Sequence, residues 1–151
     1  MSDDLRELYQ EVIVDHSKHP HNFRGMPEAN RQANGHNPLC GDRATVFLHV
    51  EDGSIRDVSF QGAGCSISTA SASMMTDALR GKTVEDARAL FERFHELVTG
   101  EPAKAERAAT ELGKLAVFAG VSEFPVRVKC ASLAWHTMKA ALEGGEKATT
   151  E

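Results

Sequence analysis

The feature that most restricts the fold of this chain is a predicted β-hairpin in its first half. Apolar residues occupy every second position from 44 to 50, which is the pattern of a half-buried strand. Asp52-Gly53 follows as a strong two-residue hairpin turn, and residues 54–61 return as a second strand. Residues 32–39 are a candidate for a third strand. The hairpin therefore predicts a small antiparallel sheet.

Helical periodicity dominates the rest of the sequence. Five helices are expected: residues 3–17, Cys65 to about 80, a helix opened by a Thr83/Asp86 capping box, residues 103–119 before Gly120, and residues 126–143 after Pro125. The sequence thus predicts an α+β fold, in which a small three-stranded antiparallel sheet packs against several helices. A chain of 151 residues is expected to form a single domain over residues 1–151, with 144–151 as a disordered tail.

Composition argues against several classes of partner. The formal net charge is −5 and the pI is about 5.8, so no nucleic acid is expected as a partner. The first residues lack the basic and apolar segments of a signal peptide, and no apolar run reaches the ~18 residues of a membrane helix. We therefore expect a cytoplasmic protein with no membrane partner.

Cys40, Cys65 and Cys130 are the only cysteines in the chain. Each lies where a glycine- or proline-marked stretch gives way to regular structure, a junction that can present a side chain at a surface. Cysteines stay reduced in the cytoplasm, so three of them indicate metal ligands or reactive thiols rather than disulfides.

The surroundings of the cysteines are suited to a metal ion. Glycine between Cys40 and Asp42 lets the chain turn tightly, so that both side chains can reach one ion. Cys65 follows Gly-Ala-Gly at a predicted helix start, a position that favours a thiolate. Three thiolates and one carboxylate form a four-coordinate set that suits zinc.

Cys130 is flanked by Arg127 and Lys129, whose positive charges also favour a thiolate. These two basic residues are candidates for partner binding, although such charges are ordinarily surface residues. Each cysteine taken alone is typical of a small buried apolar residue, and Asp42 alone is typical of a turn. For His16, His19 and His21, a solvated or capping role is favoured over metal ligation.

Three stretches give the chain a resemblance to the U-type iron–sulfur assembly proteins (IscU, SufU and the N-terminal domain of NifU). The segment from Tyr9 to Asn22 is also similar, and the resemblance extends from residue 5 to about 142. The stretches are Asn37-Pro38-Leu39-Cys40-Gly41-Asp42, Gly62-Ala63-Gly64-Cys65-Ser66-Ile67-Ser68 and Val128-Lys129-Cys130-Ala131-Ser132-Leu133-Ala134-Trp135.

At two places the chain departs from the scaffold-type members of this family and resembles the SufU branch instead. Lys129 stands where scaffold-type members carry histidine, and residues 99–122 look like an extra helical segment. The resemblance implies a SufE/NifU-like fold and a zinc ion bound by Cys40, Asp42, Cys65 and Cys130. It implies further that Cys40 is the catalytic residue, accepting persulfide sulfur from a SufS-type cysteine desulfurase and passing it to a downstream iron–sulfur scaffold or apo-protein.

Two alternatives stay open at this point. The same ligands suit a scaffold on which iron or a [2Fe–2S] cluster is assembled, because thiolates bind both metals. A structural zinc interaction module is the second alternative. Any enzymatic role would be at most that of a zinc-dependent sulfurtransferase acting with the desulfurase.

Overall fold

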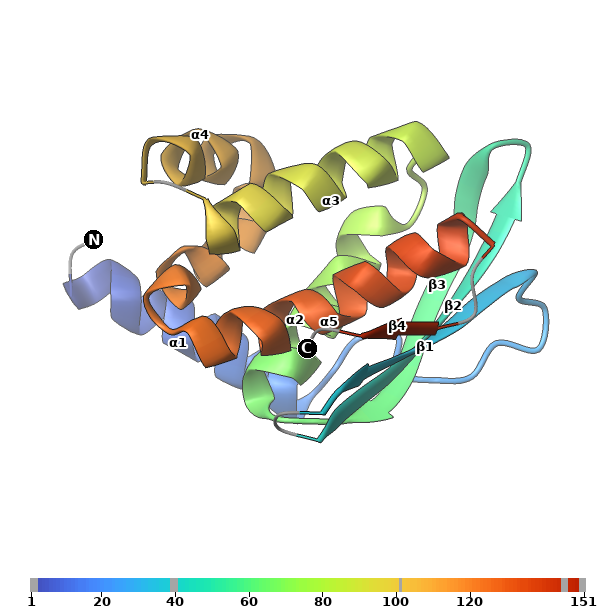
Figure 1. Cartoon of the computed structure of the whole chain (residues 1–151), viewed down its shortest axis with the longest axis horizontal. Coiled ribbons are helices and arrows are strands. Elements are labelled where there is room, and N and C mark those ends of the chain that lie inside the picture. The colour runs from blue at the N-terminus through green and yellow to red at the C-terminus, as the bar shows by residue number, and fades with distance from the viewer. Residues whose placement is uncertain (1–2, 39–40, 101, 145–146, 150–151) are drawn as a thin grey trace.

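The computed structural model describes residues 3–38, 41–100, 102–144 and 147–149 (Figure 1). Its elements, in chain order, are α1 (Asp3–Lys18), β1 (Arg31–Asn37), β2 (Asp42–Glu51), β3 (Ser54–Ala63), α2 (Ser66–Leu79), α3 (Val84–Thr99), α4 (Pro102–Leu112), the 3-10 helix η1 (Gly113–Glu123), α5 (Pro125–Leu142) and β4 (Lys147–Thr149). No helix among these residues is both long enough and apolar enough to cross a membrane.

The sheet has the strand order β3-β2-β1-β4, and the first three strands in sequence pair antiparallel. Val46 of β2 lies opposite Ala33 on one side and Phe60 on the other, and all three side chains are buried. Asp52 and Gly53 both have positive φ, as the tight turn predicted between β2 and β3 requires. The predicted three-stranded antiparallel sheet is therefore confirmed.

Helices cover one face of this sheet in two layers. In Figure 1, α5 crosses the sheet and α3 lies over α5. Helix α2 packs against β3 and α5, and α1 packs against α2. Helix α5 approaches β1 so closely that a Cβ on Gly35 would collide with Thr137 Oγ1. The predicted α+β architecture is confirmed.

An aromatic group joins the helices at the centre of the molecule. The ring of Trp135 on α5 is fully buried and stacks on Phe94 of α3, with centroids 4.6 Å apart. Phe118 of η1 meets Phe94 edge-on at 5.7 Å. The Trp135 indole N–H donates to Ser71 Oγ of α2 at 3.2 Å, and this hydroxyl donates to the Ala131 carbonyl oxygen at 2.6 Å. Four elements are thus held together by ring packing and a short hydrogen-bond chain.

The helix predicted over residues 103–119 differs in the structure. The α-helix α4 ends at Leu112, and the chain continues as 3-10 helix through Glu123. Gly113 has φ +58°, a left-handed conformation that ends an α-helix at low cost only for glycine. The apolar periodicity of this segment continues across the break, and Leu112, Leu115 and Phe118 are all buried.

Three described residues within the predicted disordered tail of residues 144–151 differ from that prediction. Residues Lys147–Thr149 form β4, which pairs parallel with β1 through the register Asn34↔Lys147 to His36↔Thr149. The backbone groups along the outer edge of β1 provide the pairing that the sequence pattern of the tail did not indicate.

Candidate metal centre

Asp42, Cys65 and Cys130 come together from three elements. Asp42 is the first residue of β2, Cys65 is the N-cap of α2, and Cys130 lies on α5. One ligand atom from each, a carboxylate oxygen and two sulfurs, lies within 4.8 Å of the other two. Residues separated by up to 88 positions (42 to 130) therefore form one compact donor group.

Two local devices bring Asp42 and Cys65 together. Gly41 has φ +74°, and its N–H donates to the Asn37 carbonyl oxygen at 2.9 Å, which closes the turn into β2. The Cys65 N–H then donates to Asp42 Oδ1 at 3.2 Å, so the carboxylate sits at the positive end of α2. Gly64 leaves room for this contact, since a Cβ there would lie 3.0 Å from Asp42 Oδ1.

The spacing of these donors fits a zinc ion. Asp42 Oδ2 and Cys65 Sγ are 3.8 Å apart, close to the ~3.6 Å expected for oxygen and sulfur on one tetrahedral zinc. The Asp42 and Cys130 side chains are buried, with 3% and 1% of their residue surface exposed. A buried carboxylate next to thiols is costly unless a cation compensates it. The three described donors thus suit zinc in both chemistry and distance.

Arg127 adds positive charge at the mouth of this group. The pKa of its guanidinium is raised, first by the charge of Cys65 and next by hydrogen bonding to Cys130. The arginine lies at the surface, one turn before Cys130 on α5. It is therefore placed to pair with whichever sulfur carries negative charge.

An apolar cavity of about 600 Å³ lies beside the same group, between α1, the start of α2 and the junction of η1 with α5. Its lining includes Tyr9, Ile13, Ile67, Val121, Phe124 and Arg127. Phe124 and the nearby Val126 are 59% and 58% exposed, unusual values for large apolar side chains. The donor group is thus bordered by exposed apolar surface.

Of the residues selected from the sequence, Asp42, Cys65, Cys130 and Arg127 lie together. Lys129 precedes Cys130 on α5, and its side chain is half-buried. Cys40, the predicted fourth ligand and catalytic residue, lies outside the described residues, so its role and the complete ligand set stay predictions. Cys65 at the start of α2 and Cys130 within the first turns of α5 stand at the positions expected for them.

A second polar cluster was not selected from the sequence. His16, His21 and Asp77 present ligand atoms within 4.8 Å of one another. Burial and then the proximity of His21 lower the pKa of His16. His19, by contrast, is exposed and lies 3.5 Å from Asp15. The only local sign of this cluster in the sequence is the group of histidines around Pro20, because Asp77 is more than fifty residues away.

Comparison with known proteins places these observations in context. Residues 8–131 match the NifU-like N terminal domain family. The chain is 43% identical over 139 residues to the "Iron-sulfur cluster assembly scaffold protein IscU" of Streptococcus pyogenes serotype M1, covering 92% of this chain and 85% of that protein. It is 39% identical over 144 residues to the "Zinc-dependent sulfurtransferase SufU" of Bacillus subtilis, covering 93% and 95%.

Solved structures agree with these matches. The crystal structure of FiSufU from Fervidobacterium islandicum AW-1 superimposes with a TM-score of 0.81 at 33% identity, over 91% of this chain and 98% of that one. A NifU-like N-terminal structure from Brucella abortus shares the fold, with a TM-score of 0.76 at 20% identity over 91% and 94%. With its sheet, its helical layers and its matched residues, the chain belongs to the NifU-like N terminal domain family.

Proposed function

We propose that this protein is a sulfur acceptor in iron–sulfur cluster assembly, taking persulfide sulfur from a SufS-type cysteine desulfurase. The observation that carries the proposal is the convergence of Asp42, Cys65 and Cys130 within 4.8 Å. With Cys40 they would bind one zinc ion, which would keep the thiolates deprotonated near neutral pH without redox chemistry of its own. The similarity to a relative named as a zinc-dependent sulfurtransferase supports this function.

Cys40 is the sulfur acceptor in this proposal. Its thiolate attacks the terminal sulfur of the desulfurase persulfide, and a new S–S bond forms at Cys40. The S–S bond to the desulfurase cysteine breaks, and that cysteine leaves as a thiolate. The step is an exchange with no net oxidation, so it needs no further reagent. The new persulfide on Cys40 is then passed to a scaffold or apo-protein.

The residues around the donor group have distinct parts in this transfer. Asp42 is held by the Cys65 N–H, which fixes the carboxylate toward the sulfurs. Arg127 lies at the surface and offers a positive charge to the Cys65 and Cys130 thiolates. The exposed Phe124 and Val126 provide apolar area on which a partner can exclude water from the transfer. We therefore expect the desulfurase to dock on the face of the 600 Å³ cavity.

A second candidate function is the scaffold on which a [2Fe–2S] cluster is assembled as cargo. The similarity to a relative named as an assembly scaffold protein favours it, at 43% identity. The same thiolates would hold the cluster. Lys129, at the position where scaffold-type members carry histidine, favours sulfur transfer instead.

One experiment separates the candidates. The protein is purified anaerobically, its zinc and iron are measured, and a SufS-type desulfurase with cysteine is added. Sulfur transfer predicts about one tightly bound zinc per chain after purification, faster alanine release, and one added sulfur on Cys40 by mass spectrometry. The Cys40→Ala variant should lose both the faster release and the added sulfur.

Other results would decide against sulfur transfer. Iron-loaded protein that leaves the desulfurase rate unchanged would favour the scaffold. Zinc-loaded protein that neither stimulates the desulfurase nor gains sulfur would favour a structural zinc module.

A further inference from the structure

We propose that His16, His21 and Asp77 form a second binding site for a divalent ion of the zinc type, separate from the cysteine group. His16 lies near the end of α1, His21 in the loop that follows, and Asp77 near the end of α2. Two imidazoles and one carboxylate are ligands that zinc and its neighbours in the transition series accept. The inference does not depend on the proposed sulfur transfer.

The ligand atoms are already close to coordination spacing. All three lie within 4.8 Å of one another, and His21 Nδ1 is 2.6 Å from Asp77 Oδ2. Two nitrogen or oxygen ligands on one tetrahedral zinc are separated by ~3.4 Å. Binding therefore needs shifts of about an ångström or slightly more at side chains that are partly or well exposed.

Surrounding hydrogen bonds orient the three ligands. Ser73 Oγ lies 2.7 Å from His16 Nδ1 and accepts the His21 backbone N–H at 2.8 Å. When His16 donates its Nδ1 proton to Ser73, the lone pair that a metal needs is left on Nε2. Partners of this kind on the second ring nitrogen are typical of metal-binding histidines.

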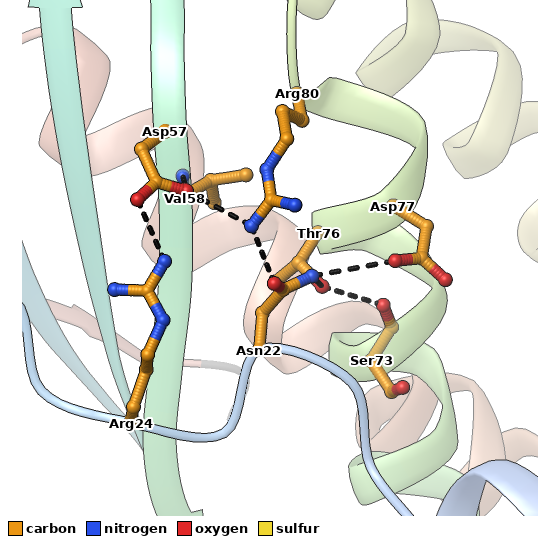
Figure 2. Close-up of polar contacts among 8 residues, drawn as sticks. All are labelled: Asn22, Arg24, Asp57, Val58, Ser73, Thr76, Asp77 and Arg80. Carbon is orange, nitrogen blue, oxygen red and sulfur yellow. Dashed lines mark hydrogen bonds and ion pairs between the residues drawn. The ribbon is translucent and has the colours of Figure 1, made fainter.

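Asn22 supports the carboxylate in the same way. Figure 2 shows its side-chain amide between α2 and Arg80, donating to Thr76 Oγ1 at 2.9 Å and to Asp77 Oδ1 at 3.3 Å. Asp77 Oδ2 is thereby left for the cluster. Asn22 itself has φ +55°, a left-handed conformation, and Arg80 donates a hydrogen bond to its amide oxygen. This network fixes the loop that carries His21.

A cavity of about 510 Å³ gives an ion access to the cluster, and Glu111 also lines it. Three basic residues line it as well: Arg80, Lys82 and Lys114. Arg80 is paired with Asp57 at 2.9 Å, which offsets its charge. The two lysines oppose a cation, so we expect weaker binding than at the thiolates.

The two sites are too far apart to share one ion. Cys65 caps the start of α2, and Asp77 lies twelve residues later on the same helix. At the rise of an α-helix this separation is ~18 Å along the axis. The rival interpretation is that His21 and Asp77 form only an ion pair that fastens the loop to α2.

The test is zinc stoichiometry by equilibrium dialysis of the full chain. The wild-type protein should bind two equivalents, the second more weakly. Both His21→Gln and Asp77→Asn should retain one equivalent, because each removes a ligand with little change in shape. The control His19→Gln, on the same loop but outside the cluster, should retain two.

Nickel provides a second measurement that does not depend on any variant. Substoichiometric Ni²⁺, added to wild-type protein that has been dialysed to keep only its tightly bound zinc, should broaden the amide resonances of residues near His16, His21 and Asp77 selectively. The proposal would be overturned by a wild-type zinc stoichiometry no greater than that of His21→Gln and Asp77→Asn, by the loss of an equivalent in His19→Gln, or by broadening centred elsewhere.

Discussion

At the scale of single residues, Arg127 is a charged group that Cys65 and Cys130 share. It interacts with both Cys65 and Cys130, yet its side chain is exposed. A group in this position can stabilise negative charge at the sulfurs without contributing much to folding, because exposed charge pairs add little to stability. Its contribution is therefore expected to be functional.

The Arg127→Gln variant should lower stimulation of the desulfurase by about two- to fivefold, the range expected for an exposed charge pair. Its unfolding midpoint should stay close to that of the wild type. Alanine release with a SufS-type desulfurase measures the first quantity, and urea unfolding measures the second. Arg107→Gln, an exposed arginine on α4, is the matched control, and equal effects of the two variants would refute a specific role for Arg127.

The close packing of Gly64 against Asp42 leads to a prediction about metal affinity. In Gly64→Ala the new Cβ would lie 3.0 Å from both Asp42 Oδ1 and Ser68 Oγ, a contact so tight that both groups must shift by a few tenths of an ångström. Displacing the carboxylate should weaken zinc binding on the order of tenfold. Competition with a chromogenic chelator measures the affinity. Gly120→Ala, where a Cβ meets nothing within 4 Å, is the control and should leave affinity unchanged.

The two polar clusters differ in how far the sequence could predict them. Asp42, Cys65 and Cys130 could be grouped because each carries a local mark, a glycine turn or a helix start, and because cysteine is rare in the chain. His16, His21 and Asp77 carry no such mark. Asp77 is an ordinary helix residue until Asn22 and Ser73 bring the loop against α2. Only tertiary packing reveals that contact.

At the scale of elements, the close approach of α5 to β1 depends on Gly35. A Cβ at this position would overlap Thr137 Oγ1 and press on Leu133 Cδ1 at 3.1 Å. Gly35→Ala should therefore destabilise the protein by ~1–3 kcal/mol, the usual cost of overpacking. Urea unfolding measures this loss.

A second substitution tests the cause. Thr137→Ala in the Gly35→Ala background should recover part of the lost stability, since it removes the hydroxyl that collides. Gly25→Ala serves as the control, because its Cβ would meet only Gln61 at ordinary contact distances. Equal losses at Gly25 and Gly35, or no recovery in the double variant, would contradict the packing argument.

The elements themselves were predictable where local chemistry decides them. The Asp52-Gly53 turn and the Thr83 cap, which accepts the Asp86 N–H at 3.1 Å, are both present as the sequence indicates. Two features of the fold were not predictable in this way. Gly113 ends an α-helix although the apolar periodicity of the sequence continues beyond it. Strand β4 forms only because the edge of β1 offers backbone partners. Such events depend on neighbours distant in the chain.

At the scale of the whole molecule, partly buried histidines make stability depend on pH. Burial, followed by the charges of His95 and Lys139, lowers the pKa of His136 below its ordinary 6.5. The unfolded chain therefore binds more protons than the folded one between the lowered pKa and 6.5. Consequently the free energy of unfolding falls as the pH drops through this window, by at most about 1.4 kcal/mol per pH unit for this proton.

Urea unfolding of chelator-treated protein at pH 7.5 and 5.5 measures this effect without a contribution from bound metal. His136→Gln should reduce the loss of stability on acidification, because the neutral side chain takes up no proton. His19→Gln, at an exposed position, should show the wild-type loss. An unchanged loss in His136→Gln would show that other groups control the dependence; His16, whose pKa is also lowered, would be the next to test.

The parallel pairing of Lys147–Thr149 with β1 also bears on how the molecule behaves in concentrated solution. These three residues cover backbone donors and acceptors at the open side of the sheet. A version shortened before Lys147 would leave these backbone groups of β1 unpaired. An unpaired edge strand can form hydrogen bonds with a strand from another chain. We expect such a version to self-associate, and a purification tag is therefore better attached at the other end of the polypeptide.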